Sequence, residues 1–158
     1  MLKLFEYNWQ VRKDWFDWCD QVLEEELLKK RTGGLGSILY TLYHIVYVEY
    51  GWISLLQGKE PKTLPSPEDA SVQTLRDCSA RCHAEIAPFI YAWNSSMEDN
   101  RLSDQNEDTG EWESYKYGEI IRHVIAHEIH HIGQLSIWSR EIGKPPVTAN
   151  LIRRGLFD

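Results

Sequence analysis

Four of the six histidines of this 158-residue chain lie close together, between His123 and His131. Within this run, His127 and His131 are four residues apart, so one turn of an α-helix places both imidazoles on the same side. The apolar residues of the segment from Ile120 to Ile142 centre on that side as well. Neutral imidazoles are ligands for zinc and similar ions. The pair therefore predicts part of a metal site, which needs a further ligand from elsewhere in the chain.

Only His44 and His83 lie outside this run, and His44 falls at the edge of the apolar arc of another helical segment. Three imidazoles, His44 with His127 and His131, fill three positions of a tetrahedral site and leave one open, as in catalytic zinc sites. Nickel, cobalt or iron can use the same nitrogens. We predict one divalent metal ion, zinc or nickel, at these residues. The alternative is that they are core residues bonded to backbone carbonyls.

Two carboxylates are candidates for a general base beside such a metal, Glu49 and Glu128. Both fall in or beside an apolar arc, so burial is expected to raise their pKa. The favoured alternative is that each accepts a hydrogen bond from the distal N–H of a ligand histidine. Residues 127–131 also match the His-Glu-x-x-His motif of zinc peptidases. A peptidase is disfavoured because Glu141 is too far along the same helix to be the third ligand.

Four further residues carry reactive side chains with weaker indications. His123 and His130 fall towards the edge of the apolar face, and we expect them to be solvated or near the entrance of the site. Cys78 and Cys82 lie one helical turn apart, and such a pair is more often a packing contact than a metal or disulfide site.

Helical periodicity predicts four long helices, over about residues 3–30, 37–57, 67–96 and 117–142. Ser37 is a suitable cap for the second helix, and Ser66 with Pro67 for the third, in which Pro88 is expected to introduce a kink. The segment 98–113 has turn chemistry and is predicted to be an acidic loop that can hold a small hairpin. We therefore predict an all-α four-helix bundle that forms a single domain over residues 1–158.

Composition excludes several functional classes. The formal net charge is −7 and the negative charge is concentrated in segment 98–113, so we expect no nucleic-acid partner. Three cysteines are more typical of a reducing compartment than of a disulfide framework. No apolar run reaches the length of a signal peptide or a membrane span, so we expect a soluble cytoplasmic protein without a membrane partner.

The second helix carries tyrosines on the side opposite its apolar arc, which suits either a homodimer interface or packing against a neighbouring helix. These residues are Tyr40, Tyr43, Tyr47 and Tyr50.

The chain resembles the DinB/YfiT-like family over nearly its whole length. The resemblance rests on the segment from Leu42 to Trp52, on His127-x-x-x-His131-x-Gly133-Gln134-Leu135, and on Gly-Lys-Pro-Pro at 143–146. It implies a four-helix bundle that binds a divalent metal through one histidine of the second helix and two of the last. Those positions correspond to His44, His127 and His131.

The resemblance also implies a reaction class. Some members of the family are transferases or isomerases that use low-molecular-weight thiols, others resemble hydrolases, and many have no assigned reaction. We therefore expect a small-molecule substrate, with metal-dependent thiol S-transfer as the leading hypothesis. A metal-dependent hydrolase and a metal-binding bundle without catalysis are the alternatives.

Overall fold

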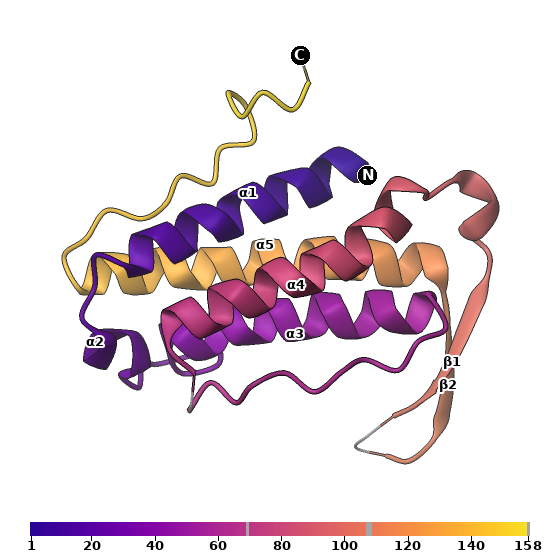
Figure 1. The fold of residues 1–158 in the computed structure, drawn as a ribbon, viewed down its shortest axis with the longest axis horizontal. Helices are drawn as coiled ribbons and strands as arrows, with labels where there is room; N and C mark the ends of the chain where they lie inside the picture. The colour runs from indigo at the N-terminus through magenta and orange to yellow at the C-terminus, as the bar shows by residue number, and fades with distance from the viewer. Residues whose placement is uncertain (69, 107–108, 158) are drawn as a thin grey trace.

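The structure of the chain is a computed structural model that describes residues 1–68, 70–106 and 109–157 (Figure 1). Four long helices dominate it, which confirms the prediction of an all-α four-helix bundle. The elements in chain order are α1 (Leu2–Cys19), α2 (Glu24–Leu28), α3 (Ile38–Leu56), α4 (Val72–Tyr91), a 3-10 turn (Ser95–Met97), β1 (Arg101–Gln105), β2 (Trp112–Lys116) and α5 (Tyr117–Glu141).

The helices are not joined in a simple up-and-down order. The segment between α3 and α4 runs back along the length of the bundle, so these two helices point in the same direction (Figure 1). Helices α1 and α5 point the opposite way, and α5 packs against both α3 and α1. As a result, the C-terminal end of α3 lies beside the N-terminal end of α5, and the hairpin β1–β2 stands at that end of the bundle (Figure 1).

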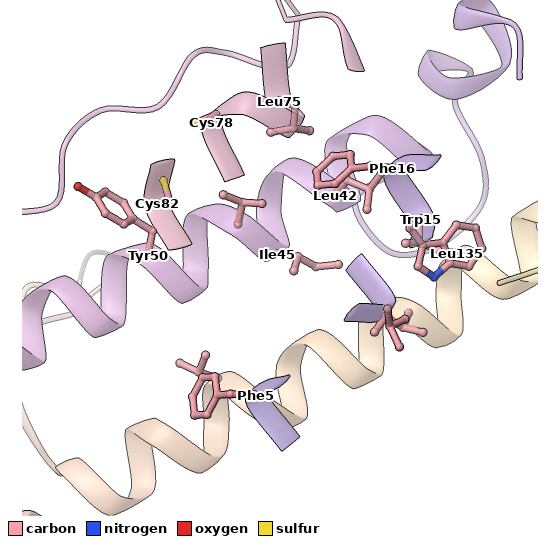
Figure 2. Close-up of a cluster of buried hydrophobic side chains, with 14 of the residues drawn as sticks. Phe5, Trp15, Phe16, Leu42, Ile45, Tyr50, Leu75, Cys78, Cys82 and Leu135 are labelled. Atoms are coloured by element: carbon pink, nitrogen blue, oxygen red, sulfur yellow. The ribbon is translucent and has the colours of Figure 1, made fainter. Parts of the chain in front are cut away.

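The core lies where the apolar faces of these helices meet. Complete burial of a large aliphatic or aromatic side chain stabilises the fold by about 1.5–3 kcal/mol. The cysteines Cys78 and Cys82 are buried in this core, as their predicted packing role requires. Figure 2 shows side chains from all four long helices gathered there, among them Phe5, Trp15, Leu42, Ile45, Leu75, Cys78, Cys82 and Leu135.

The first predicted helix is wrong at its C-terminal end. Helix α1 stops at Cys19, the chain turns, and a separate short helix α2 begins at Glu24. Three consecutive glutamates, Glu24 to Glu26, occupy the first turn of α2. Acidic side chains are favoured at a helix N-terminus by the helix dipole, so this run marks the start of a new helix rather than the middle of a long one.

The third predicted helix starts too early. Helix α4 begins at Val72, because the Ser71 hydroxyl accepts a hydrogen bond from the Thr74 backbone N–H at 3.1 Å. Ser66 forms a local turn instead, accepting from the backbone N–H of Glu68. At its other end, α4 includes Pro88 and stops at Tyr91, followed by the 3-10 turn.

The other boundaries agree with the prediction. Ser37 caps α3 by accepting a hydrogen bond from the backbone N–H of Tyr40. The segment 98–113 contributes to an antiparallel hairpin in which Leu102 pairs with Tyr115. The last helix ends within one residue of the predicted position. None of the described helices is long and apolar enough to cross a membrane.

Candidate metal centre

Three predicted ligands come together between two antiparallel helices. His44 belongs to α3, and His127 and His131 lie one turn apart on α5. The Nε2 atom of His127 lies 3.0 Å from Nε2 of His44 and 3.1 Å from Nε2 of His131. Among the described residues, these three histidines form the group whose ligand atoms all lie within 4.8 Å of one another. The geometry therefore joins residues that are 83 positions apart in the sequence.

These nitrogens fit a divalent cation. Zn–N distances of 2.0–2.1 Å in a tetrahedral site place neighbouring nitrogens about 3.3 Å apart, close to the spacing found here. The Nδ1 atom of His131 faces the Oε1 acceptor of Gln134 at 2.7 Å, so Nδ1 carries the hydrogen and Nε2 keeps a lone pair. If all three rings are neutral, at most one hydrogen atom can lie in the two contacts that Nε2 of His127 makes, so one of the two contacts is not a full hydrogen bond. A cation satisfies all three nitrogens at once.

Burial keeps the three imidazoles neutral. Burial, together with the nearby His131 and His44, lowers the pKa of His127 to about 3. Burial also lowers the pKa of His44 and of His131, although the bond to Gln134 opposes the shift at His131. The lone pairs of all three rings are therefore available at neutral pH, which is the protonation state that metal binding requires.

Gln134 positions the ligand His131, a role that sequence reasoning did not assign. Its amide also donates from Nε2 to Nε2 of His130 at 3.1 Å, which fixes the orientation of the amide. Gly34 lies directly against it, because a Cβ on Gly34 would fall 2.6 Å from Oε1 of Gln134. The available signal was spacing, since a residue three positions after a ligand histidine lies on the same helical face.

The two candidate bases, Glu49 and Glu128, lie in a separate buried cluster with Arg12 of α1. The Arg12 guanidinium donates from Nε and Nη2 to the two oxygens of Glu128, at 2.9 and 2.5 Å. Its Nη1 donates to Oε2 of Glu49 at 2.6 Å, and the indole of Trp9 donates to Oε1 of the same carboxylate at 2.7 Å. Arg12 is thus the partner of both carboxylates, and Trp9 is a second partner of Glu49.

We call Arg12, Glu49 and Glu128 the Arg12 triad, and within it the charges of the three side chains interact mainly with one another. Burial disfavours the charged guanidinium, but Glu128 and Glu49 more than offset it and raise the pKa of Arg12 above its ordinary value. Burial raises the pKa of Glu128, although Arg12 opposes the shift. Sequence reasoning missed Arg12. Its position on the helix could have indicated burial, because Arg12 lies three residues after Trp9 and four before Phe16, on the apolar stripe of α1.

The remaining candidates lie outside the centre. His123 and His130 are exposed on α5, at the edge where they were expected. The rings of His83 and Trp9 pack edge to face, with centroids 4.3 Å apart. On the tyrosine face of α3, Tyr50 is buried and donates to Glu85 of α4, which is packing against a neighbouring helix, whereas Tyr47 is about half exposed.

A helical bundle that brings three imidazoles together between antiparallel helices fits the class of metal-binding four-helix bundles. The sequence matches the DinB family over residues 1–154. It is also 45% identical, over 159 aligned positions, to the uncharacterized protein YizA of Bacillus subtilis (strain 168), covering 99% of this chain and 96% of that protein. The chain belongs to the DinB family, which confirms the family expected from the sequence.

Proposed function

We propose that this protein holds one divalent ion, zinc or nickel, at His44, His127 and His131, and that it transfers a low-molecular-weight thiol to a small electrophile. The observation that carries the proposal is the convergence of three neutral Nε2 atoms, 3.0 and 3.1 Å apart, in a half-buried position between α3 and α5. Three nitrogen ligands leave a fourth tetrahedral position for an exogenous group.

A cation bound in this position lowers the pKa of a thiol that reaches it, which makes the thiolate available at neutral pH. The residues of the chain hold the three nitrogens in place, with Gln134 fixing the tautomer of His131. In the transfer, the sulfur forms a bond to the electrophilic carbon and the bond to the leaving group breaks. The leaving group departs with the bonding electrons, and the thiol proton goes to solvent.

The thiol has to come from outside the protein. All three cysteines, Cys19, Cys78 and Cys82, are buried in the core. Burial raises the pKa of Cys19 and of Cys82 to about 12, so these thiols remain protonated and poorly nucleophilic at neutral pH. The burial of all three cysteines, with the raised pKa of Cys19 and Cys82, supports the use of a small thiol cosubstrate.

The alternative of a metal-dependent hydrolase needs a carboxylate that is free to take a proton from water. Both sequence candidates, Glu49 and Glu128, are hydrogen-bonded to the buried guanidinium of Arg12. We infer that they hold α1, α3 and α5 together rather than act as bases. This arrangement favours thiol transfer over hydrolysis.

Thiol binding at the centre can be observed spectroscopically. Cobalt-loaded protein titrated with cysteine or glutathione is expected to develop a sulfur-to-cobalt charge-transfer band in the near ultraviolet. The His127→Ala, His131→Ala double variant should show no such band, and His83→Gln, which changes a histidine outside the centre, should behave like the unmodified chain. Metal-loaded protein should then accelerate the reaction of cysteine with 1-chloro-2,4-dinitrobenzene over metal-free protein.

Three results would redirect the proposal. Metal-dependent hydrolysis of nitrophenyl esters without any thiol would support the hydrolase. Tight metal binding with neither a thiol band nor turnover would support a metal-binding bundle without catalysis. Absence of metal binding would remove the basis for all three.

A homodimer and a cytoplasmic location complete the proposal. The half-exposed Tyr47, stacked on Tyr43, leaves an aromatic surface on α3 that suits a contact between two copies. Light scattering after size-exclusion chromatography gives the mass in solution, and a monomeric mass would contradict the dimer.

A further inference from the structure

We propose that a recess beside the metal centre, walled by the acidic hairpin β1–β2, binds an organic ammonium group of the small-molecule substrate. This inference rests on the proposed function, because it names the chemistry of the compound that meets the thiol. It also assigns a role to the acidic segment, which the metal centre does not use.

The recess consists of two adjoining cavities of about 480 and 320 Å³, which share Trp52 of α3 and Tyr115 of β2 as a common wall. The larger cavity reaches Val48, one helical turn after His44. The smaller one reaches His123, one turn before His127, with the two imidazole centroids 5.7 Å apart.

Both cavities therefore lie next to the metal ligands, towards the end of the bundle where α3 and α5 meet the hairpin (Figure 1). A ligand bound in the recess would lie one helical turn from His44 on α3 and one turn from His127 on α5.

The residues that line the recess carry a net negative charge. No lysine or arginine is among the described residues that line it. Within the described part of the chain, none of the carboxylates that line it forms an ion pair with a lysine or arginine. These carboxylates are Glu60, Asp104, Glu113 and Glu119.

Aromatic side chains supply the rest of the recess wall. Trp52 and Tyr115 meet edge to face, with centroids 6.1 Å apart and an interplanar angle of 88°, and Tyr47 also lines the larger cavity. The π-faces of Trp and Tyr attract ammonium groups, and nearby carboxylates add a favourable charge interaction. Together they favour an organic cation and repel an anion.

The opposite face of the bundle provides a contrast within the same molecule. A cavity of about 270 Å³ between α1 and α4 is lined by cationic side chains, including Lys13 and Arg76, and by no carboxylate among the described residues. The negative recess is thus a local property of the surface beside the metal ligands, and not a uniform consequence of the net charge of −7.

Isothermal titration calorimetry with three probes of similar size tests the inference: benzyltrimethylammonium, benzyl alcohol and benzoate. Each probe is titrated into metal-free and into zinc-loaded full-length protein. We expect the ammonium probe to bind in both states, at least tenfold more tightly than benzyl alcohol, and benzoate not to bind. Binding of benzyl alcohol or benzoate as tightly as the ammonium probe would overturn the inference.

A pair of charge-matched double variants locates the binding. Glu60→Gln with Asp104→Asn removes two charges from the recess, and the amide oxygen introduced by the second substitution keeps the acceptor that the Gln105 backbone N–H uses. The control, Glu24→Gln with Glu25→Gln, removes two exposed charges from α2. The recess variant should weaken the ammonium probe about tenfold and the control should leave it unchanged. Equal effects of the two variants would overturn the inference.

The two proposals fail separately. Protein that takes up zinc but does not bind the ammonium probe retains its metal centre and disproves the ammonium site. Protein that binds the probe in the recess but takes up no zinc disproves the proposed function, while its cation selectivity stands. A calcium competition adds one more outcome. If millimolar calcium displaces the probe, and the recess variant binds calcium as well as the unmodified chain does, then the probe binds outside the recess and the ammonium site is disproved.

Discussion

Two polar clusters connect α3 to α5, and they differ in whether a side chain of the protein supplies the positive charge. In the Arg12 triad, the guanidinium bonds both buried carboxylates, and the indole of Trp9 serves the remaining oxygen of Glu49. In the metal centre, three imidazole nitrogens face one another, and the group that they form contains no lysine or arginine. The first cluster is complete within the protein, whereas the second could be completed by a metal ion from outside.

The contrast depends on a single step along one helix. His127 and Glu128 are consecutive residues of α5, and a helix turns about 100° per residue. That rotation directs the imidazole to His44 of α3 and the carboxylate to Arg12 of α1. Neighbours in sequence therefore belong to different sites, one that links the helices and one that could hold a metal ion. The predictions below test this division.

The largest effect is expected from removing the cation of the triad. Arg12→Met leaves two buried carboxylates without their partner, and we expect the free energy of unfolding to fall by about 3–5 kcal/mol. Urea denaturation of metal-free protein measures it. Lys13→Met, which removes an exposed lysine one residue away, should leave the denaturation midpoint unchanged.

The same triad offers a sharper comparison. Replacing all three members together, Arg12→Met with Glu49→Leu and Glu128→Leu, removes the desolvation penalties along with the ion pairs, so the triple variant should be more stable than Arg12→Met alone. A triple variant no more stable than the single one would show that the carboxylates have a role beyond pairing with Arg12.

The next effect concerns the metal centre. Because a ligand that binds only the folded state stabilises it, zinc at a thousand times its dissociation constant should raise the free energy of unfolding by about 4 kcal/mol. The His127→Ala, His131→Ala variant should gain nothing from zinc. Denaturation with and without zinc, under otherwise equal conditions, measures the difference, and an equal gain in both proteins would place zinc elsewhere.

A smaller effect separates the residues that support the ligands. Gln134→Leu removes the acceptor that fixes the tautomer of His131, and we expect zinc affinity to fall about 10- to 100-fold. His130→Leu removes only the other partner of this amide and should leave the affinity within about twofold. Competition against a chromogenic zinc chelator gives both values. Equal losses in the two variants would indicate a general disturbance of α5.

The smallest effect concerns the cysteines of the protein, which we expect not to react with an alkylating reagent. Because burial raises the pKa of Cys19 and Cys82 to about 12, these cysteines remain protonated at pH 8, and iodoacetamide should modify neither in the folded state. Mass spectrometry after labelling checks this, with guanidinium-unfolded protein as the positive control. Rapid modification of either cysteine in folded protein would reopen the question of where the thiolate comes from.

Much of the metal centre could be predicted because its pattern is local. His127 and His131 lie one turn apart on a helix whose apolar face is clear from the sequence, so their common direction follows from helix geometry. Assigning His44 needed no knowledge of packing, since it lies at the edge of the apolar arc of its helix and the family resemblance implies a ligand in the second helix. The four long helices followed from periodicity in the same way.

The Arg12 triad could not be predicted because it depends on distances that no local pattern encodes. Arg12 is 37 residues from Glu49 and 116 from Glu128, and their contact requires the packing of three helices. The errors at the helix ends have a different cause. The start of α4 was set by a choice between two serine caps, Ser66 and Ser71, which propensity does not distinguish.

Metal content tests the account most directly. Purified tag-free protein, reconstituted with zinc or nickel and desalted, should contain about one divalent ion per chain by elemental analysis, and so should His83→Gln. The His127→Ala, His131→Ala variant should contain none while keeping its helical circular dichroism spectrum. Metal-free wild-type protein after reconstitution, or a variant that retains the ion, would contradict the assignment of the centre to His44, His127 and His131.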